Sequence, residues 1–462
     1  MPIEIRNPAA PDKIVATYDE TPDNALDEVV ARARAAQLEW AALPQPERGV
    51  MVTNFVNALE TRSEEIAKSI TKEMGKPLAE ARGEAMKALG EARASVARAN
   101  APIGEVFGSQ IPGTVSYSTR RPRGVILGIN PWNFPFSTPM RKAIPALVYG
   151  NAIILKPASL TPGAVALMAE VAASTLPENL VQAVIGRGAL GQALAEHRGI
   201  DAVSFTGSVE VGKRVATAAA GHLAEVSLEL GGKNPAILND ASDLETVLDQ
   251  ILLAAFAVCG QRCTAVSRVI VHRDIEEAVV SGLAALAAAM EPMDGMIEGA
   301  KIGPLASAQQ LEDVAGFVSR AVSDGAVIAA GGHRLEIPGR GYFYAPTILR
   351  GVTRDMEIAR QEVFGPVLSL IAYDTVDEAL SIANDTAFGL SSCLYSERTD
   401  LVERFVAESE SGMLHVNAGS FPENHLPFVG IKDSSMGVGG SNGPSTIQFY
   451  TTEHAVYRRA CV

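Results

Sequence analysis

The stretch G-V-I-L-G-I-N-P-W-N-F-P at residues 124–135 begins a regular alternation of short apolar runs and helical patterns. The apolar runs are short and rich in β-branched residues, which is typical of buried strands. Strands alternating with helices predict an α/β fold with a doubly wound parallel sheet, which binds ligands at the carboxyl ends of its strands. The expected strands are V-I-L-G-I (125–129), A-I-I-L-K (152–156), V-Q-A-V-I (181–185), A-V-S-F (202–205) and E-V-S-L-E (225–229).

A second alternation of strands and helices follows, and it predicts a second α/β domain at residues 231–440. Ahead of the first sheet, apolar residues recur at helical spacing from about Thr21 to Pro102, which predicts a lobe of packed helices. We therefore assign residues 1–112 and 124–230 to the first domain. A chain of 462 residues is long enough for two or three domains.

Two further segments have no core of their own. Residues 113–122 alternate and predict an exposed strand pair, and the tail from about Ser445 alternates as well. An edge strand of this kind needs a partner. We assign residues 113–123 and 441–462 to a small β arm, and we expect a homodimer or homotetramer.

Composition excludes several classes of protein. A net charge of −14 opposes binding to nucleic acid. No apolar run is long enough to span a bilayer, so no membrane association is expected. The first residues lack a signal-peptide pattern, and four cysteines in this length make no disulfide framework. We expect a cytoplasmic protein without a bound metal.

Two glycine-rich runs carry groups suited to covalent chemistry. E-L-G-G-K-N-P at 229–235 begins with a carboxylate, Glu229, and C-G-Q-R-C-T at 259–264 contains a thiol, Cys263. Such a pair suits a reaction in which a thioester forms and water later removes it. A cysteine hydrolase is an alternative, although no histidine stands in a recognisable motif.

Together with P-W-N-F-P (131–135), F-T-G-S (205–208) and E-V-F-G-P (362–366), these runs make the chain resemble the aldehyde dehydrogenase superfamily over nearly its whole length. The run E-M-G-K-P-L-A-E-A-R-G-E (73–84) is most similar to the succinate-semialdehyde members, with 2-oxoglutarate-semialdehyde dehydrogenases also close. The resemblance implies that Cys263 is the nucleophile and that Glu229 activates the water of deacylation. It also implies that the Asn133 amide and a backbone N–H form the oxyanion hole.

The resemblance implies NAD or NADP as the cofactor. Gly186, Gly188 and Gly191 form a literal G-x-G-x-x-G, but members of the family hold the pyrophosphate near the F-T-G-S turn, at a helix start. Many NAD-preferring members have glutamate where this chain has Ser159, so we expect NADP to be accepted at least as well as NAD. The expected cofactor-binding residues are Trp132, Lys156, Ser159, Arg187, Gly188, Thr206, Gly207, Ser208, Leu230, Glu362 and Phe364.

Arg141 is the candidate for the far end of the substrate. It stands eight residues after Asn133 on a predicted helix, or ~12 Å of rise. The matching arginine of succinate-semialdehyde dehydrogenases binds the substrate carboxylate, so the resemblance implies succinate semialdehyde or a similar semialdehyde. A second arginine of some such enzymes is replaced here by Ala257, and Arg262 is a possible substitute.

Three alternatives remain open at the level of sequence. In the first, the substrate is a small uncharged aldehyde. In the second, the chain is a catalytically retired binding protein. Cys259, four residues before Cys263, is either a small buried residue or a resolving thiol. The segment L-P-F-V-G-I-K-D-S-S-M-G also departs from the family pattern, with Val429 and Ser435 where glycines are usual.

Overall fold

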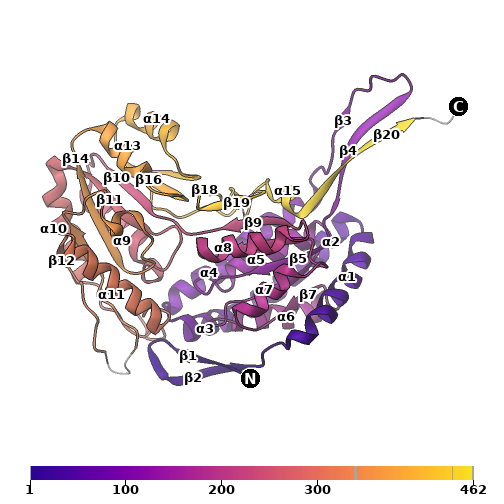
Figure 1. The fold of residues 1–462 in the computed structure, drawn as a ribbon, viewed down its shortest axis with the longest axis horizontal. Coiled ribbons are helices and arrows are strands. Elements are labelled where there is room, and N and C mark those ends of the chain that lie inside the picture. The colour runs from indigo at the N-terminus through magenta and orange to yellow at the C-terminus, as the bar shows by residue number, and fades with distance from the viewer. Residues whose placement is uncertain (1, 338–340, 440, 460–462) are drawn as a thin grey trace.

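The computed structural model describes residues 2–337, 341–439 and 441–459 of the chain. Figure 1 shows two lobes side by side and a narrow arm that projects from one of them. Each lobe is built around its own sheet and its own large cluster of buried apolar side chains. The predicted α/β fold class is confirmed.

The first lobe contains a six-stranded sheet whose strands are parallel except for the edge strand β19. All five predicted strands are present. With β19 added at the edge, the six strands in sheet order are β19 (Ser435–Gly437), β9 (Glu225–Glu229), β8 (Ala202–Thr206), β5 (Val125–Ile129), β6 (Ala152–Lys156) and β7 (Val181–Ala183). The chain order reverses between β5 and β8, and ligands of doubly wound sheets bind at such a switch point.

Helices cover this sheet and form the predicted helical lobe. Their apolar faces join the sheet in a single core. The helices around the strands are α5 (Ser137–Val148), α6 (Gly163–Thr175), α7 (Gly188–Glu196) and α8 (Val209–Ala220). The N-terminal helices are η1 (Asp23–Ala25), α1 (Leu26–Ala42), α2 (Gln45–Thr61), α3 (Ser63–Met74), α4 (Leu78–Val96) and η2 (Ala97–Asn100).

The second lobe contains a seven-stranded sheet, in which only β12 runs antiparallel to its neighbour. Its strands, in sheet order, are β12 (Val327–Ala330), β13 (Thr347–Arg350), β14 (Val367–Tyr373), β11 (Val266–His272), β10 (Asn234–Leu238), β16 (Ser391–Tyr395) and β17 (Met413–Val416). Its helices are α9 (Leu244–Phe256), η3 (Ala257–Gly260), η4 (Arg273–Ile275), α10 (Glu276–Ala288), α11 (Ala308–Ser323), α12 (Glu357–Arg360), α13 (Val376–Asn384) and α14 (Thr399–Glu408).

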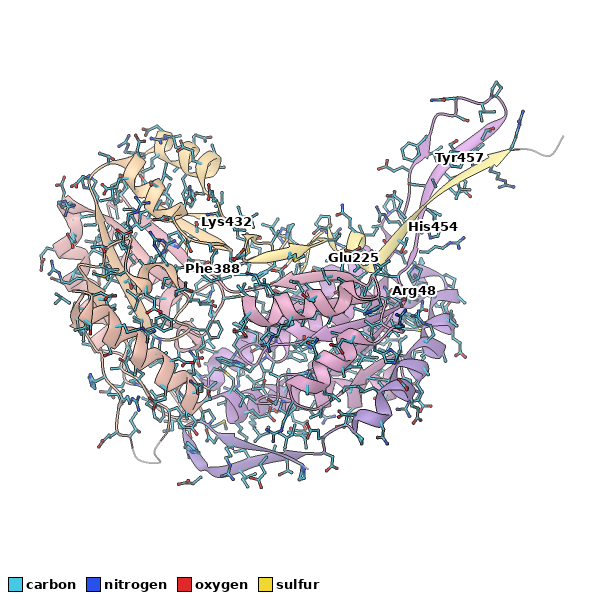
Figure 2. The ribbon with its side chains drawn as sticks, in the orientation of Figure 1. Arg48, Glu225, Phe388, Lys432, His454 and Tyr457 are labelled. Carbon is cyan, nitrogen blue, oxygen red and sulfur yellow. The ribbon has the colours of Figure 1, made fainter. Side chains whose placement is uncertain are left out.

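The arm differs from its prediction in two ways. Residues 113–122 form one strand, β4 (Thr114–Pro122), rather than a strand pair, and its partners are β20 (Thr451–Arg459) and β3 (Val106–Phe107). The tail begins with a short helix, α15 (Thr446–Tyr450), because Phe449 and Tyr450 are buried against the first core. The last predicted arm residues, 460–462, lie outside the described part of the chain. Figure 2 shows His454 and Tyr457 on β20, along the projecting arm.

Two short pairs complete the fold. β1 (Ile3–Asn7) and β2 (Ala10–Tyr18) form an antiparallel hairpin. β15 (Phe388–Gly389) pairs with β18 (Ile431–Lys432). Within the described residues, no helix combines the length and the apolar character needed to cross a bilayer.

Candidate active site

Cys263 lies in the loop between α9 and β11, after a turn with unusual backbone geometry. Val258, Cys259 and Gly260 all have left-handed backbone, with φ of 58°, 56° and 69°. A β-branched residue such as valine is a genuine outlier in this region. A side chain at position 260 would lie 2.2 Å from the carbonyl oxygen of Gly365, so only glycine fits there.

The Cys263 thiol is half-buried beside an apolar cluster of Leu390, Met413 and Phe428. Its carbonyl oxygen accepts a hydrogen bond of 2.7 Å from the side chain of Asn234. Burial and the nearby Glu362 carboxylate raise the pKa of the thiol to about 12. The thiol therefore carries its proton at neutral pH, and a reaction at sulfur requires a proton acceptor.

Asn133 follows β5, and the fold brings it next to the cysteine loop. Its side-chain nitrogen donates to the carbonyl oxygen of Gln261 at 2.8 Å, two residues before Cys263. Its own carbonyl oxygen accepts from Lys76 Nζ at 2.7 Å. The fold thus brings together the amide and the thiol that sequence reasoning paired.

Glu229 is the last residue of β9 and is only 3% exposed. Among the described residues, no hydrogen bond of good geometry reaches either of its carboxylate oxygens, although the nearby backbone N–H of Ser441 favours the charged form. Burial raises the pKa of Glu229 to about 8, although the charges of Lys142 and Arg141 oppose the shift. A buried carboxylate with free oxygens and a pKa near the working pH is suited to accept a proton.

Lys142 was not predicted from the sequence. It lies on α5, one residue after Arg141, and its Nζ donates to Thr206 Oγ1 at 2.7 Å. Burial lowers the pKa of Lys142 to about 7, while the charge of Glu229 raises it. Nothing in the local pattern marks this lysine, because only the tertiary packing of α5 on β5 and β6 brings it to Thr206 and near the glutamate.

The F-T-G-S turn joins β8 to α8 and presents a helix N-terminus at the switch point. Ser208 caps α8 by accepting from the backbone N–H of Val211, and Gly207 N–H donates to the carbonyl of Glu229 at 3.1 Å. Leu230 packs against α8 at Gly212, where an added side chain would lie 2.6 Å from the leucine. A hollow lies between α7 and α8, lined by Gln192, Glu196, Lys213, Arg214, Thr217, Ala218 and Gly221.

The 186–191 turn lies beside the end of β6. A side chain at Gly191 would come within 3.6 Å of Lys156 Cε, which places α7 against the lysine. Arg187 caps α7, and Gly188 is its first residue. Ser159 lies three residues beyond Lys156 in the loop after β6.

Glu20 is a second residue that sequence reasoning missed. Its carboxylate accepts from the backbone N–H of Arg187 at 3.2 Å. Burial lowers the pKa of Lys156 to about 8, and Glu20 opposes that shift. An acidic group therefore stands near Lys156 even though position 159 is serine. It comes from the segment after β2, so no local motif around Lys156 could reveal it.

Glu362, Phe364 and Trp132 converge from two lobes. The rings of Trp132 and Phe364 meet edge to face at 5.3 Å, and Phe364 has left-handed backbone with φ of 56°. Glu362 accepts from Gly232 N–H at 3.1 Å, and burial raises its pKa to about 7. The charge of Glu362 also raises the pKa of the Cys263 thiol, so this carboxylate lies near Cys263 as well.

Arg141 lies close to the thiol, but its guanidinium already has a partner. Its Nε and Nη2 donate to the two carboxylate oxygens of Glu91 at 2.8 and 2.7 Å. Its guanidinium carbon is 5.0 Å from the ring centre of Phe428, the residue that packs against Cys263. The fork that we expected to bind substrate is therefore occupied by Glu91, and Nη1 is the nitrogen not used in this pair.

Two more cations lie in the same region. Arg262 Nη2 donates to Ser420 O and Thr264 Oγ1, whereas the buried Nη1 has no hydrogen-bond partner in the described residues. Lys87 Nζ donates to Pro422 O at 2.7 Å. Burial lowers the pKa of Lys87 to about 8, and the charges of Arg141 and Arg262 lower it further. These residues, Lys87, Arg141 and Arg262, form a cation cluster beside the thiol.

Cys259 is 1% exposed and packs within the second core. Burial raises its pKa well above the ordinary value for a thiol. This setting favours the small buried residue over the resolving thiol.

The segment around Val429 and Ser435 keeps its backbone pairing despite the missing glycines, since Ser435 lies opposite Glu229 in the β19–β9 ladder.

Comparisons with known proteins identify the family and the fold. The profile of the aldehyde dehydrogenase family matches residues 1–456. An alpha-ketoglutaric semialdehyde dehydrogenase of Bacillus subtilis (strain 168) is 37% identical over 98% of this chain and 94% of its own length. A betaine aldehyde dehydrogenase of Brucella anthropi is 34% identical over 99% and 93%. The crystal structure of lactaldehyde dehydrogenase from Escherichia coli is 33% identical, with a TM-score of 0.96, over 100% of this chain and 96% of that one.

Proposed function

This chain belongs to the aldehyde dehydrogenase family, and we propose that it oxidises a carboxylate-bearing semialdehyde through a thioester on Cys263. The observation that carries the reaction is the convergence of Cys263, Asn133 and the unpartnered Glu229 at one switch point. The cation cluster is the observation that supports the proposed class of substrate. The chemistry needs only these side chains, the bound cofactor and water.

The thiol gives its proton to water, which carries it to bulk solvent, as sulfur bonds to the aldehyde carbon. The carbonyl oxygen becomes an oxyanion that the Asn133 amide and the Cys263 N–H stabilise. Loss of hydride from that carbon leaves the thioester. Glu229 then takes a proton from water as the water oxygen attacks the thioester, and the carboxylate and thiol are released.

The family uses NAD or NADP, and the residues of the first lobe fit such a group. The capped N-terminus of α8 suits a pyrophosphate, since its free N–H groups and dipole favour an anion. Lys156 would hold the adenosine ribose, and Glu362 with Phe364 would position the nicotinamide ribose. When bound, the nicotinamide supplies the hydride acceptor of the reaction.

We predict that two residues move cofactor preference in opposite directions. Ser159→Glu should lower the NADP/NAD ratio of kcat/KM, and Glu20→Gln should raise it, each by about tenfold, because ~1.4 kcal/mol of repulsion acts on the 2′-phosphate. Steady-state kinetics with both cofactors measure the ratio. If neither variant changes it, the 2′-phosphate lies elsewhere and this assignment is wrong.

The cation cluster supports a substrate with a distal carboxylate. Within the cluster three cations face only two carboxylates, Glu91 and Glu80, so the cluster itself has an excess of positive charge. Glu229 and Glu362 add negative charge on the thiol side of the site. The positive excess within the cluster opposes betaine aldehyde, which carries a quaternary ammonium. It favours succinate semialdehyde or the alpha-ketoglutaric semialdehyde named for the Bacillus subtilis relative. A small uncharged aldehyde is the alternative, since the relatives include a lactaldehyde dehydrogenase.

Arg141 can be tested without leaving a buried carboxylate unpaired. Arg141→Ala alone would strand Glu91, and stranding one partner of a buried ion pair costs ~3–5 kcal/mol of stability. The informative comparison is Glu91→Gln against the double variant Glu91→Gln/Arg141→Met. The double variant should raise KM for succinate semialdehyde by ~10–100-fold over the single one, since a charge-assisted hydrogen bond contributes ~1.5–3 kcal/mol.

The control substrate is butanal, which has the same chain length and no carboxylate. Its KM should differ little between the two variants. Equal losses on both aldehydes would show that Arg141 shapes the site rather than binding the carboxylate, and Arg262, with its unpartnered Nη1, would become the candidate.

The reaction itself is tested by absorbance at 340 nm with a panel of C2–C6 aldehydes, with and without a terminal carboxylate. Growth of reduced nicotinamide is expected, fastest with the carboxylate-bearing members. Cofactor binding without reduction by any aldehyde would favour the retired binding protein instead.

We also propose that the arm joins copies of this chain. Its strands project from the body and expose large apolar side chains, with Val106 81% and Tyr457 76% exposed (Figure 2). Exposed apolar edges of this kind mark interaction surfaces. Light scattering of the full chain should give the mass of a dimer or tetramer, and a monomer would contradict the assignment.

A further inference from the structure

One helix, α4, contacts both loops that carry the donors of the proposed oxyanion hole. The two donors come from different loops, since Asn133 follows β5 and Cys263 follows α9. Lys76, just ahead of α4, and two glutamates on its buried face reach these loops. Residues four apart on a helix lie on one face about 6 Å apart, so the helix can fix the spacing between the two loops.

Glu84 and Lys76 hold the loop that carries Asn133. One Glu84 oxygen accepts from the N–H groups of Phe136 and Ser137, both at 3.0 Å. The other accepts from Lys76 Nζ at 2.6 Å, and this lysine also donates to Asn133 O. Both side chains are almost fully buried, so these bonds are shielded from water.

Glu80 holds the other loop. Its two carboxylate oxygens accept from the backbone N–H of Val258 at 3.0 and 3.1 Å. Val258 begins the left-handed turn that leads to Cys263. A left-handed residue costs ~1–2 kcal/mol, and such strain persists only where the surroundings enforce it. Glu80 supplies an acceptor for Val258 N–H in this strained conformation.

We propose that Glu80 is a positioning residue for the oxyanion hole, which it sets by fixing the Val258 turn relative to the Asn133 loop held by Glu84. The inference rests on the proposed dehydrogenase function. Glu80 touches neither substrate nor sulfur and acts only through the turn. A displacement of about 1 Å between a donor and the developing oxyanion can lower a rate by ~10²-fold.

Two conservative variants separate geometry from charge. Glu80→Asp keeps the charge but draws the carboxylate away from Val258 N–H. Glu80→Gln loses the charge but keeps an oxygen within reach of the same N–H. The rate constant for the first turnover, followed as reduced nicotinamide in a stopped-flow instrument, should fall ~10–100-fold in Glu80→Asp and stay within about threefold in Glu80→Gln.

Alkylation of Cys263 by iodoacetamide tests whether the cysteine loop as a whole is disturbed, because such a disturbance would change the alkylation rate. This displacement at carbon forms no oxyanion, so its rate, measured by mass spectrometry of the Cys263 peptide, should remain within about twofold in both variants. Arg82→Ala, on the exposed side of α4 where Arg82 pairs with Glu64, is the matched control and should leave both rates unchanged.

The outcomes are distinct. If Glu80→Asp completes its first turnover as fast as the wild-type protein does, the positioning role is overturned. A fall in the alkylation rate that parallels the fall in first turnover would also overturn it, because the whole loop would then be displaced. A slower first turnover in Glu80→Gln than in Glu80→Asp would do the same, because charge would then matter instead of geometry. If the wild-type protein forms no reduced nicotinamide with any aldehyde, the proposed function fails rather than this inference.

Discussion

Cys263→Ala should abolish oxidation of every aldehyde while the protein still binds the nicotinamide cofactor. The expected loss in kcat is about 10⁴-fold or more, because no other group can form the thioester that the reaction requires. The other two described thiols, Cys259 and Cys393, are buried and have raised pKa values, so neither can substitute. Absorbance at 340 nm measures turnover, and fluorescence titration with NADPH measures binding.

Cys393→Ala is the matched control, since it removes a thiol from β16 in the core and should keep turnover within a few-fold. Alanine at position 263 is smaller and uncharged, so the cofactor contacts of the first lobe should persist. Residual turnover near the wild-type level would rule out Cys263 as the nucleophile. Loss of both turnover and cofactor binding would indicate that the variant had disturbed the fold rather than the chemistry.

The fold was largely predictable because strand and helix periods are local properties. All five strands from 125–129 to 225–229 are present, since each is a short run of strand-forming residues and four of the five are followed by a helical pattern. The arm was less predictable. Whether 113–122 forms a hairpin or one strand depends on a partner more than 300 residues away, and β4 pairs with β20.

The candidate site divides in the same way. Cys263, Glu229 and Asn133 stand in short motifs, so sequence could single them out. Lys142 and Glu20 could not be found, because their importance depends on which distant residue they approach.

Arg141 illustrates a further limit. Its place on α5 predicted a position near the thiol, and it does lie there. No local pattern indicated that Glu91, on α4, would accept both hydrogen bonds from Arg141. Pairing between two helices depends on their packing, which the spacing within one helix does not determine.

Glu229→Gln should release one equivalent of reduced nicotinamide per active site and then stall. The amide has the shape of the carboxylate but cannot take a proton from water, so the thioester forms and its hydrolysis slows by ~10²–10⁴-fold. Stopped-flow absorbance at 340 nm gives the burst amplitude, and mass spectrometry of the quenched protein should find the acyl group on Cys263. A variant with normal steady-state turnover would show that another base activates the water.

The pH dependence adds an independent check. Burial raises the pKa of Glu229 to about 8, and only the deprotonated carboxylate can accept the proton. Deacylation in the wild-type protein should therefore accelerate as the pH rises through about 8 and level off above it. The slow deacylation of Glu229→Gln should lack this rise, because the amide does not titrate. The same rise in Glu229→Gln would assign the titration to another group.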